Sequence, residues 1–410
     1  MTEGGSGAAD GRRLVALAGL AFALVSLDQG ILPPLLPLVA SRLDTPPARA
    51  SVLVTAYAVG AGLLPLLAGP WSDRRGRAAA LVAGLLLFSA GGALFAIASA
   101  LPAALAARAL SGMGAGVVSF SVTAAVGDVV EYRDRTRAMA TLVAANLTAL
   151  IAGPALIAIA PPLVSPPVVF ASLAALGLPL AVVLRAAAPA MPRREPSGPR
   201  PSYAAFFRRR ETRLGLAVSF LSSAAIAPPI VFLSSWLVAR HGFDLRDVGL
   251  VYLAGCAAPL LSAAIAGRLA RRFPNREMIV VSSLPLAAAV LLVAPMADVA
   301  TFFVPVLFAI AVLVQTVRSA ALQSLHTALV AESERGSYVV LKNSFAQAGI
   351  AAGALLGGLF YGSGERFLSV AALSAAAAVL SAVATLPLRE DALPGREGAS
   401  PLHRAGVPPV

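Results

Sequence analysis

The chain has 410 residues, of which 58% are hydrophobic and only 13% are charged, and its mean hydropathy is +0.82. Soluble domains are about half apolar and about a quarter charged, so this composition excludes an ordinary soluble protein. The net charge of +12 resembles that of nucleic-acid-binding proteins. However, the cationic residues are spread over short loops without aromatic neighbours, so we expect no nucleic-acid partner.

Apolar runs recur along the whole chain, and each is close to the ~20 residues that cross a hydrocarbon core of ~30 Å. We therefore expect an all-α polytopic membrane protein with twelve transmembrane helices in two pseudo-symmetric six-helix halves, with the lipid bilayer as its surroundings. The twelve runs lie at 14–40, 51–71, 79–101, 104–127, 138–160, 167–185, 214–239, 248–267, 278–297, 301–328, 338–361 and 367–388.

The loops differ strongly in positive charge. If the N-terminus lies inside, the segments on that side hold 25 of the 32 Lys and Arg residues, and the opposite segments hold 5. Short loops rich in Lys and Arg stay in the cytoplasm, so we expect both termini to be cytoplasmic. The near-total use of arginine over lysine, together with abundant alanine, is typical of a high-GC bacterial genome and favours the bacterial inner membrane.

A linker rich in proline, glycine and arginine interrupts the apolar pattern at 186–213. Such a linker between two sets of six spans is typical of transporters that hold substrate between two halves. The expected organisation is a cytoplasmic N-terminus (1–13), an N-terminal half (14–185), the cytoplasmic linker (186–213), a C-terminal half (214–388) and a disordered cytoplasmic tail (389–410).

Asp28 is the only acid well inside a predicted span, in the stretch "LVSLDQGILPPLLP" at 24–37. A charge near the bilayer centre costs at least ~2.5–3.5 kcal/mol, so such a group usually faces a cavity or a partner. Burial disfavours the carboxylate and a nearby cation favours it, which suits a residue that binds and releases a proton. The alternative is a structural acid bonded to another helix.

Two arginines also lie within spans. Arg108 is the expected counter-charge of Asp28, although it could instead extend to the outer surface. Arg318 shares a polar helix face with Gln315, Ser319 and His326. It could bind an anionic substrate group or balance Asp28, whereas a histidine near a helix end is more often a structural hydrogen-bonding group.

Other polar residues within spans complete the expected substrate cavity. The prolines at 33, 34, 37, 228 and 229 should kink or break the first and seventh spans, as happens where backbone lines a cavity. The remaining cavity candidates are Gln29, Asn146, Trp236, Asn343 and Gln347.

Three motifs are similar to those of the major facilitator superfamily. "GPWSDRRGRAAAL" follows the second span and resembles the G-x-x-x-D-R-x-G-R signature, and "RALSGMGAG" (108–116) resembles the R-x-x-x-G-x-G segment of the fourth helix. "AGPALIA" (152–158) resembles the fifth-helix antiporter motif through Gly153 and Pro154, but Ile157 and Ala158 replace two expected glycines. The resemblance extends from about 12 to 390.

The resemblance implies a cytoplasmic latch that holds the two halves in the outward-open state. In the family, the acid of the first motif faces the N-terminal end of the eleventh helix, where the helix dipole favours negative charge. The alternative is that these charges only set the topology. The implied latch residues are Gly69, Asp73, Arg74, Gly76, Arg77 and Asp128.

These features favour a proton-driven exporter of small amphiphilic molecules that resembles the twelve-helix drug:proton antiporters linked to multidrug resistance. Its partners would be the substrate and protons, and we expect a monomer. The alternatives are a symporter or facilitator that imports a sugar, organic acid or similar metabolite, and a non-transporting sensor or scaffold. The sequence carries no phosphate-binding GxxxxGK[ST], and it has one cysteine and three histidines. We therefore expect no enzyme activity, cofactor or metal site.

Overall fold

A computed structural model describes residues 3–129, 142, 146, 148–149, 152–159, 165–186, 203–331, 334–362 and 366–388, and the regular structure of this part is helical. The helices are α1 (Glu3–Arg42), α2 (Pro47–Ala50), α3 (Val52–Arg75), α4 (Arg77–Ile97), α5 (Leu101–Val129), α7 (Pro166–Ala186), α8 (Tyr203–Arg208), α9 (Arg210–His241), α10 (Leu245–Ala257), α11 (Pro259–Ala270), α12 (Asn275–Val299), α13 (Phe303–Ala328), α14 (Arg335–Tyr361) and α15 (Phe367–Thr385).

Ten helices of the described part are long and apolar enough to cross a membrane, which confirms ten of the twelve predicted spans. The fifth predicted span falls largely outside the described residues, although 152–159 are helical. The eighth, predicted as one helix over 248–267, is divided by a turn at Ala258 into α10 and α11. Pro259 begins α11, where its missing backbone N–H costs no hydrogen bond within that helix.

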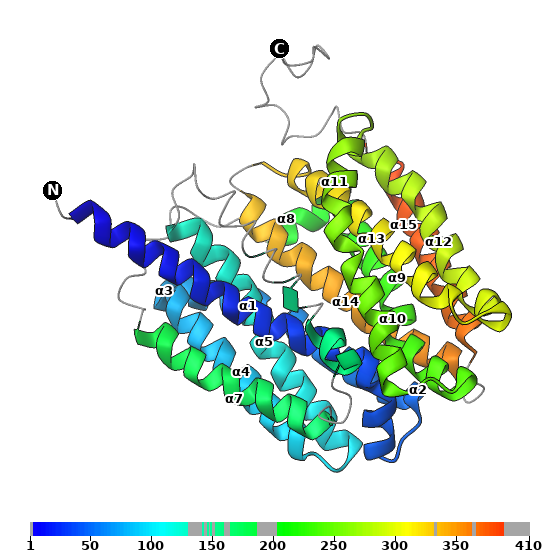
Figure 1. Cartoon of the computed structure of the whole chain (residues 1–410). Coiled ribbons are helices and arrows are strands. Elements are labelled where there is room, and N and C mark those ends of the chain that lie inside the picture. Colours follow the sequence, from blue (N-terminus) through cyan, green and yellow to red (C-terminus); the bar gives the residue numbers. More distant parts are fainter. Residues whose placement is uncertain are drawn as a thin grey trace.

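The helices form two bundles that lie side by side, with α3, α4, α5 and α7 in one and α9 to α15 in the other (Figure 1). In the first bundle, α5 packs against α3, α4 and α1, and α4 packs against α7. In the second, α9 packs against α14 and α15, and α12 packs against α13 and α15. One apolar core lies within residues 18–184. Residues 187–202 of the predicted linker (186–213) and the tail (389–410) fall outside the described residues, and residues 203–213 of the linker include α8 and the start of α9.

We expected a kink or a break at the mid-helix prolines, and α1 and α9 are continuous, so no break occurs. A proline has no N–H and therefore frees the carbonyl four residues before it. Pro37 frees the carbonyl of Pro33, which accepts a hydrogen bond from the Ser234 hydroxyl of α9 at 2.6 Å. Pro229 frees the carbonyl of Ala225, to which Ser374 of α15 donates. Serines of neighbouring helices thus satisfy two of the backbone carbonyls that the prolines release.

The two bundles contact each other along α3 and α14, from the end that carries the α1–α2 loop, which is the predicted outer end, to Gly62, whose carbonyl accepts a hydrogen bond from the Ser344 hydroxyl at 2.6 Å. The Thr55 hydroxyl donates to the Ala351 carbonyl at 3.1 Å, and the Ser51 hydroxyl donates to the Ala354 carbonyl at 3.3 Å. A second apolar core of the C-terminal half also includes Leu36 and Ala40 of α1. Apolar packing and hydrogen bonds from hydroxyl side chains to backbone carbonyls therefore close the two halves against each other at this end.

Candidate functional site

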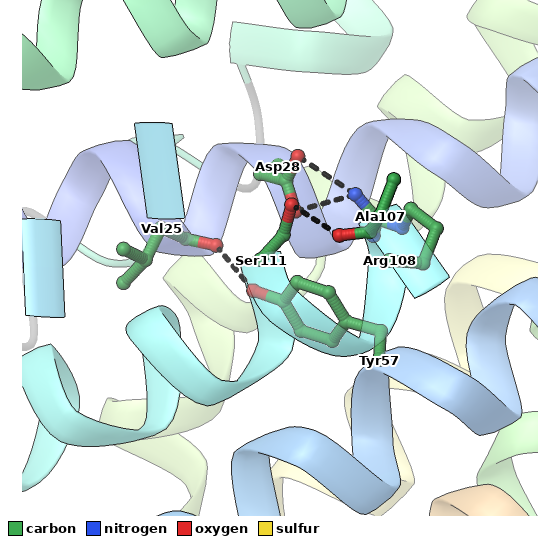
Figure 2. Close-up of polar contacts among 6 residues, drawn as sticks. All are labelled: Val25, Asp28, Tyr57, Ala107, Arg108 and Ser111. Atoms are coloured by element: carbon green, nitrogen blue, oxygen red, sulfur yellow. Dashed lines mark hydrogen bonds and ion pairs between the residues drawn. The ribbon is translucent and has the colours of Figure 1, made fainter. Parts of the chain in front are cut away.

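A buried ion pair joins α1 to α5 inside the N-terminal bundle. The Arg108 guanidinium donates through Nη1 to both carboxylate oxygens of Asp28, at 2.9 Å each. Both side chains are 1% exposed, so the pair is shielded from solvent (Figure 2). The structure thus brings together the two residues that the sequence predicted as partners, and Arg108 does not extend to the surface.

Aromatic rings enclose the Arg108 guanidinium. Its Cζ lies 4.4 Å from the ring centre of Tyr57 on α3, 5.5 Å from that of Phe95 on α4 and 5.2 Å from that of Phe170 on α7. A desolvated cation over such rings is stabilised by roughly 2 kcal/mol. The Tyr57 hydroxyl donates to the Val25 carbonyl, one turn before Asp28, at 3.3 Å (Figure 2).

Glycines set the spacing of the helices around this pair. A Cβ on Gly112 of α5 would lie 2.0 Å from the Tyr57 carbonyl oxygen, and one on Gly60 of α3 would lie 2.3 Å from that of Ala109. On the other side of α5, a Cβ on Gly91 of α4 would lie 2.3 Å from the Ser111 amide nitrogen. Only glycine allows backbones this close. The "RALSGMGAG" motif therefore holds Arg108 between α1, α3 and α4.

This arrangement is chemically suited to a protonation switch. When Asp28 is ionised, its charge and that of Arg108 neutralise each other in a low-dielectric interior. When Asp28 binds a proton, a cation remains that is surrounded by rings and has no acidic partner, and its Nε already lacks a hydrogen-bond acceptor. The two protonation states differ greatly in local electrostatic energy, so they can favour different helix arrangements.

The antiporter-like segment contacts α1 around Asp28. A Cβ on Gly153 would lie 3.2 Å from Leu27 Cδ1 and 3.4 Å from Ile31 Cβ, and these residues flank Asp28 in the sequence. Both Gly153 and Pro154 are buried. Further along this segment, Ala158 lies against Gly249 of α10, in the other half. The segment therefore lies between the Asp28 turn and the C-terminal half.

The C-terminal bundle buries Arg318 without an acid. Its Nη2 donates to the Ser381 hydroxyl at 2.7 Å, its Nη1 lies 3.5 Å from Gln315 Oε1, and its Nε has no partner. The side chain is 0% exposed, and in the described residues no carboxylate lies within ion-pair distance of it. Arg318 and Asp28 therefore occupy the cores of separate halves and do not pair in this conformation.

Buried hydrogen bonds hold His326 in place. Its Nε2 is 2.9 Å from the Ser219 hydroxyl, and its Nδ1 is 3.4 Å from that of Tyr338. The ring is 3% exposed, as expected if His326 is a structural hydrogen-bonding group. Beside it, Lys342 on α14 is 6% exposed and donates to Gln323 Oε1 at 2.7 Å. The sequence analysis missed Lys342, although its position in an apolar run was a usable signal.

The remaining cavity candidates do not share one environment. Trp236 is buried and stacks on Phe367, with the ring centres 4.8 Å apart. Its indole therefore packs within the C-terminal core. Gln29 and Asn343 are exposed, and the half-buried candidates are Asn146, Gln315, Ser319 and Gln347.

The predicted latch is described only in part. Gly76 joins α3 to α4 with φ 95°, a backbone conformation that favours glycine. The Arg77 guanidinium donates to the Ser72 hydroxyl at 3.1 Å and lies over the Phe120 ring at 5.6 Å. The surroundings of the other latch residues lie outside the described part; these residues are Gly69, Asp73, Arg74 and Asp128.

Comparisons with known proteins agree on one family. A family model described as Major Facilitator Superfamily matches residues 18–328 and 215–409. The uncharacterized MFS-type transporter YceJ of Bacillus subtilis is 25% identical over 87% of this chain and 91% of its own. Multidrug resistance protein 1 of the same organism is 30% identical, but over only 31% of this chain and 33% of its own.

Solved structures share the fold at low sequence identity. A mutant of the nucleoside transporter NupG aligns with a TM-score of 0.75 and 12% identity, over 91% of this chain and 99% of its own. A D-xylose-proton symporter aligns with a TM-score of 0.71 and 13% identity, over 94% and 98%. At these identities the likeness concerns the fold alone.

Proposed function

Because this chain belongs to the Major Facilitator Superfamily of membrane transporters, we propose that it exports small amphiphilic molecules in exchange for protons. The observation that carries this proposal is the buried Asp28–Arg108 pair. Placing an ion pair within the bilayer costs free energy, so such pairs usually have a function. One recurrent function is proton transfer through the carboxylate. We place the protein in a bacterial inner membrane as a monomer, with both termini in the cytoplasm.

The proposed cycle alternates access between the two sides. Asp28 receives a proton when the halves open outward, and the loss of its charge weakens the attraction between α1 and α5. Cargo leaves outward in that state. The halves then close at the outer end, Asp28 releases its proton inward, and the pair with Arg108 forms again. The closed outer end and the intact ion pair of this structure fit the last stage of the cycle.

The motif after α3 would act as the latch of the outward-open state. Its backbone supports this role, since Gly76 gives the tight turn between α3 and α4. Asp73 would meet the N-terminal end of α14, and Arg77 would link to Asp128. In the inward-open state these contacts would separate while the outer-end contacts form.

Proton-coupled import of a metabolite is the second candidate. The incomplete antiporter motif favours it, because Ile157 and Ala158 stand in place of two glycines. The partial match to Multidrug resistance protein 1 supports export. The direction of the proton relative to cargo separates the two mechanisms.

The test compares wild type with Asp28→Asn. A growth screen in a strain without its own pumps first identifies exported compounds, and purified protein in liposomes then reports proton movement through a pH-sensitive dye. We expect wild type to move protons against the cargo and Asp28→Asn to lose the coupled movement. Protons moving with the cargo would establish symport. Full coupled transport by Asp28→Asn would remove Asp28 from the mechanism.

A further inference from the structure

An apolar cavity of about 440 Å³ lies between α8, α9 and α14, near the predicted cytoplasmic end. Its volume falls within the roughly 300–1,000 Å³ of small-molecule sites. Three aromatic rings, Phe207, Phe220 and Phe345, form much of its lining, and Phe207 and Phe345 contact each other with ring centres 5.9 Å apart. These walls suit the apolar body of an amphiphile.

One charged side chain, Arg213, lines this cavity, and a second cation, Lys342, is buried behind the α14 wall. Arg213, near the start of α9, is exposed and lines the cavity itself. Lys342 lies on α14 three residues before Phe345, and residues at this spacing are neighbours on one helix face. The ammonium is buried and bonded to the neutral Gln323, so no acid compensates it.

Nearby acids do not cancel these cations. Glu334 is held by Arg209 through two hydrogen bonds of 2.5 and 2.9 Å, which raise the pKa of Arg209 and leave that pair neutral. Glu211 is exposed and lies two residues from Arg213, about 200° around α9 by helix geometry. Among the described residues, Asp28 is the one buried acid, and it lies in the other half beside Arg108.

We propose that this cavity binds amphiphilic organic anions, with the apolar body against the phenylalanines and the negative group at Arg213, in the positive potential of the buried Lys342. Buried Arg318, also without an acid, adds positive potential to the same half. The proposal rests on the transport function and specifies the charge of its cargo. A soluble organic anion and an anionic lipid share this chemistry.

Three probes with one apolar body and different charges test the proposal. These are 4-phenylbutyrate, 4-phenylbutylamine and 4-phenyl-1-butanol, titrated calorimetrically into the full-length protein in nanodiscs of phosphatidylcholine. We expect the carboxylate to bind at least about tenfold more tightly than the amine, because a buried charge binds its opposite and rejects its like. Equal or tighter binding of the amine or the alcohol, or no carboxylate binding, would overturn the proposal.

Variants assign the charge preference to this cavity. Arg213→Gln should weaken carboxylate binding about threefold, since its guanidinium is exposed. Lys342→Met should also weaken it about threefold, because Lys342 acts on the anion through its field and not by contact. Lys342→Arg should retain most of the affinity, and the exposed Arg272→Gln controls for net charge. Unchanged carboxylate binding in both Arg213→Gln and Lys342→Met would place the site elsewhere and refute the assignment.

A lipid arm identifies the natural source of the anion. If phosphatidylglycerol added to the nanodiscs competes with 4-phenylbutyrate in wild type, the cavity takes lipid; without competition it takes a soluble anion. Both results support an anion site. Binding also separates this proposal from proton coupling. Loss of proton antiport with the carboxylate preference intact would refute only the coupling mechanism, and the reverse result would refute only the anion site.

Discussion

Asp28 and Arg108 are equally buried, but substitution of one leaves the other in a different environment. Removing Asp28 leaves a cation that three aromatic rings still contact. Removing Arg108 leaves a buried carboxylate that keeps the Tyr57 hydroxyl as a neutral polar neighbour but has no cation beside it. The rings stabilise the arginine specifically, so the pair is asymmetric.

Arg108→Met should therefore destabilise the protein by about 3–5 kcal/mol, the usual result of leaving one member of a buried ion pair. Asp28→Asn should cost less, because the amide keeps the shape and can still accept from the guanidinium. The double variant Asp28→Asn/Arg108→Met should recover part of the loss of the arginine variant. Chemical unfolding in detergent measures all three. A double variant no more stable than Arg108→Met would show that the interaction with Asp28 is not what Arg108 contributes.

The sequence predicts the two members of this pair but not the residues around them. An acid and an arginine that each lie in an apolar run can be predicted to pair, because each charge needs a partner within the bilayer. Tyr57, Phe95 and Phe170 carry no such signal, since an aromatic residue in a membrane helix faces lipid as readily as a neighbour. Which face points inward depends on how α3, α4 and α7 rotate against α5, and a single sequence does not contain that information.

Helices are more predictable than contacts in this protein. Ten spans follow the apolar runs closely, since crossing the bilayer requires both length and internally satisfied backbone. The expected breaks at prolines in α1 and α9 fail because Ser234 and Ser374 satisfy the freed carbonyls from other helices. In the eighth span the turn at Ala258 precedes Pro259. Whether a proline bends or ends a helix depends on tertiary partners that lie far away in the sequence.

Glycines between α3, α4 and α5 lead to an element-scale prediction. Gly112→Ala should separate α5 from α3, because the added Cβ would lie 2.0 Å from the Tyr57 carbonyl oxygen, which is backbone and cannot rotate away. We expect a lower melting temperature and reduced transport, since the shift also moves Tyr57 from Arg108. Thermal unfolding and proteoliposome transport measure both effects.

Gly267→Ala is the matched control. It lies in α11, and a Cβ there would meet no atom within 4 Å. Alanine is favoured over glycine in a helix by up to about 1 kcal/mol, so this variant should be as stable as wild type or slightly more so. If both alanine variants behaved alike, close approach of α5 to α3 would not be what Gly112 provides.

At the scale of the whole molecule, the two halves hold separate buried charges and contact each other along α3 and α14. The N-terminal half buries an ion pair that is neutral overall, and the C-terminal half buries Arg318 and Lys342 without an acid among the described residues. If Asp28 carries the proton and the C-terminal half holds an anionic cargo, the two ligands act on different halves. Movement of one half against the other then couples the two ligands.

In the proposed cycle, the contacts at the predicted outer end break and re-form in every turnover. Thr55 of α3 and Ala351 of α14 lie at this contact, where the hydroxyl meets the carbonyl at 3.1 Å. In a Cys256→Ser background, Thr55→Cys/Ala351→Cys should form a disulfide under mild oxidation, because the two helices are packed together there. The bond should hold the outer end closed, so transport should stop and should recover when the bond is reduced.

Each single cysteine variant should transport normally under the same oxidation, which separates the effect of the bond from that of the substitutions. Gel mobility after cleavage of the linker between the halves reports the fraction that is cross-linked. Transport that continues at full rate in the cross-linked fraction would mean that this contact does not open during the cycle. Asp28 and a site in the other half would then have to be coupled by movements that leave the outer end closed. Rigid opening and closing of the two halves at that end would not explain the coupling.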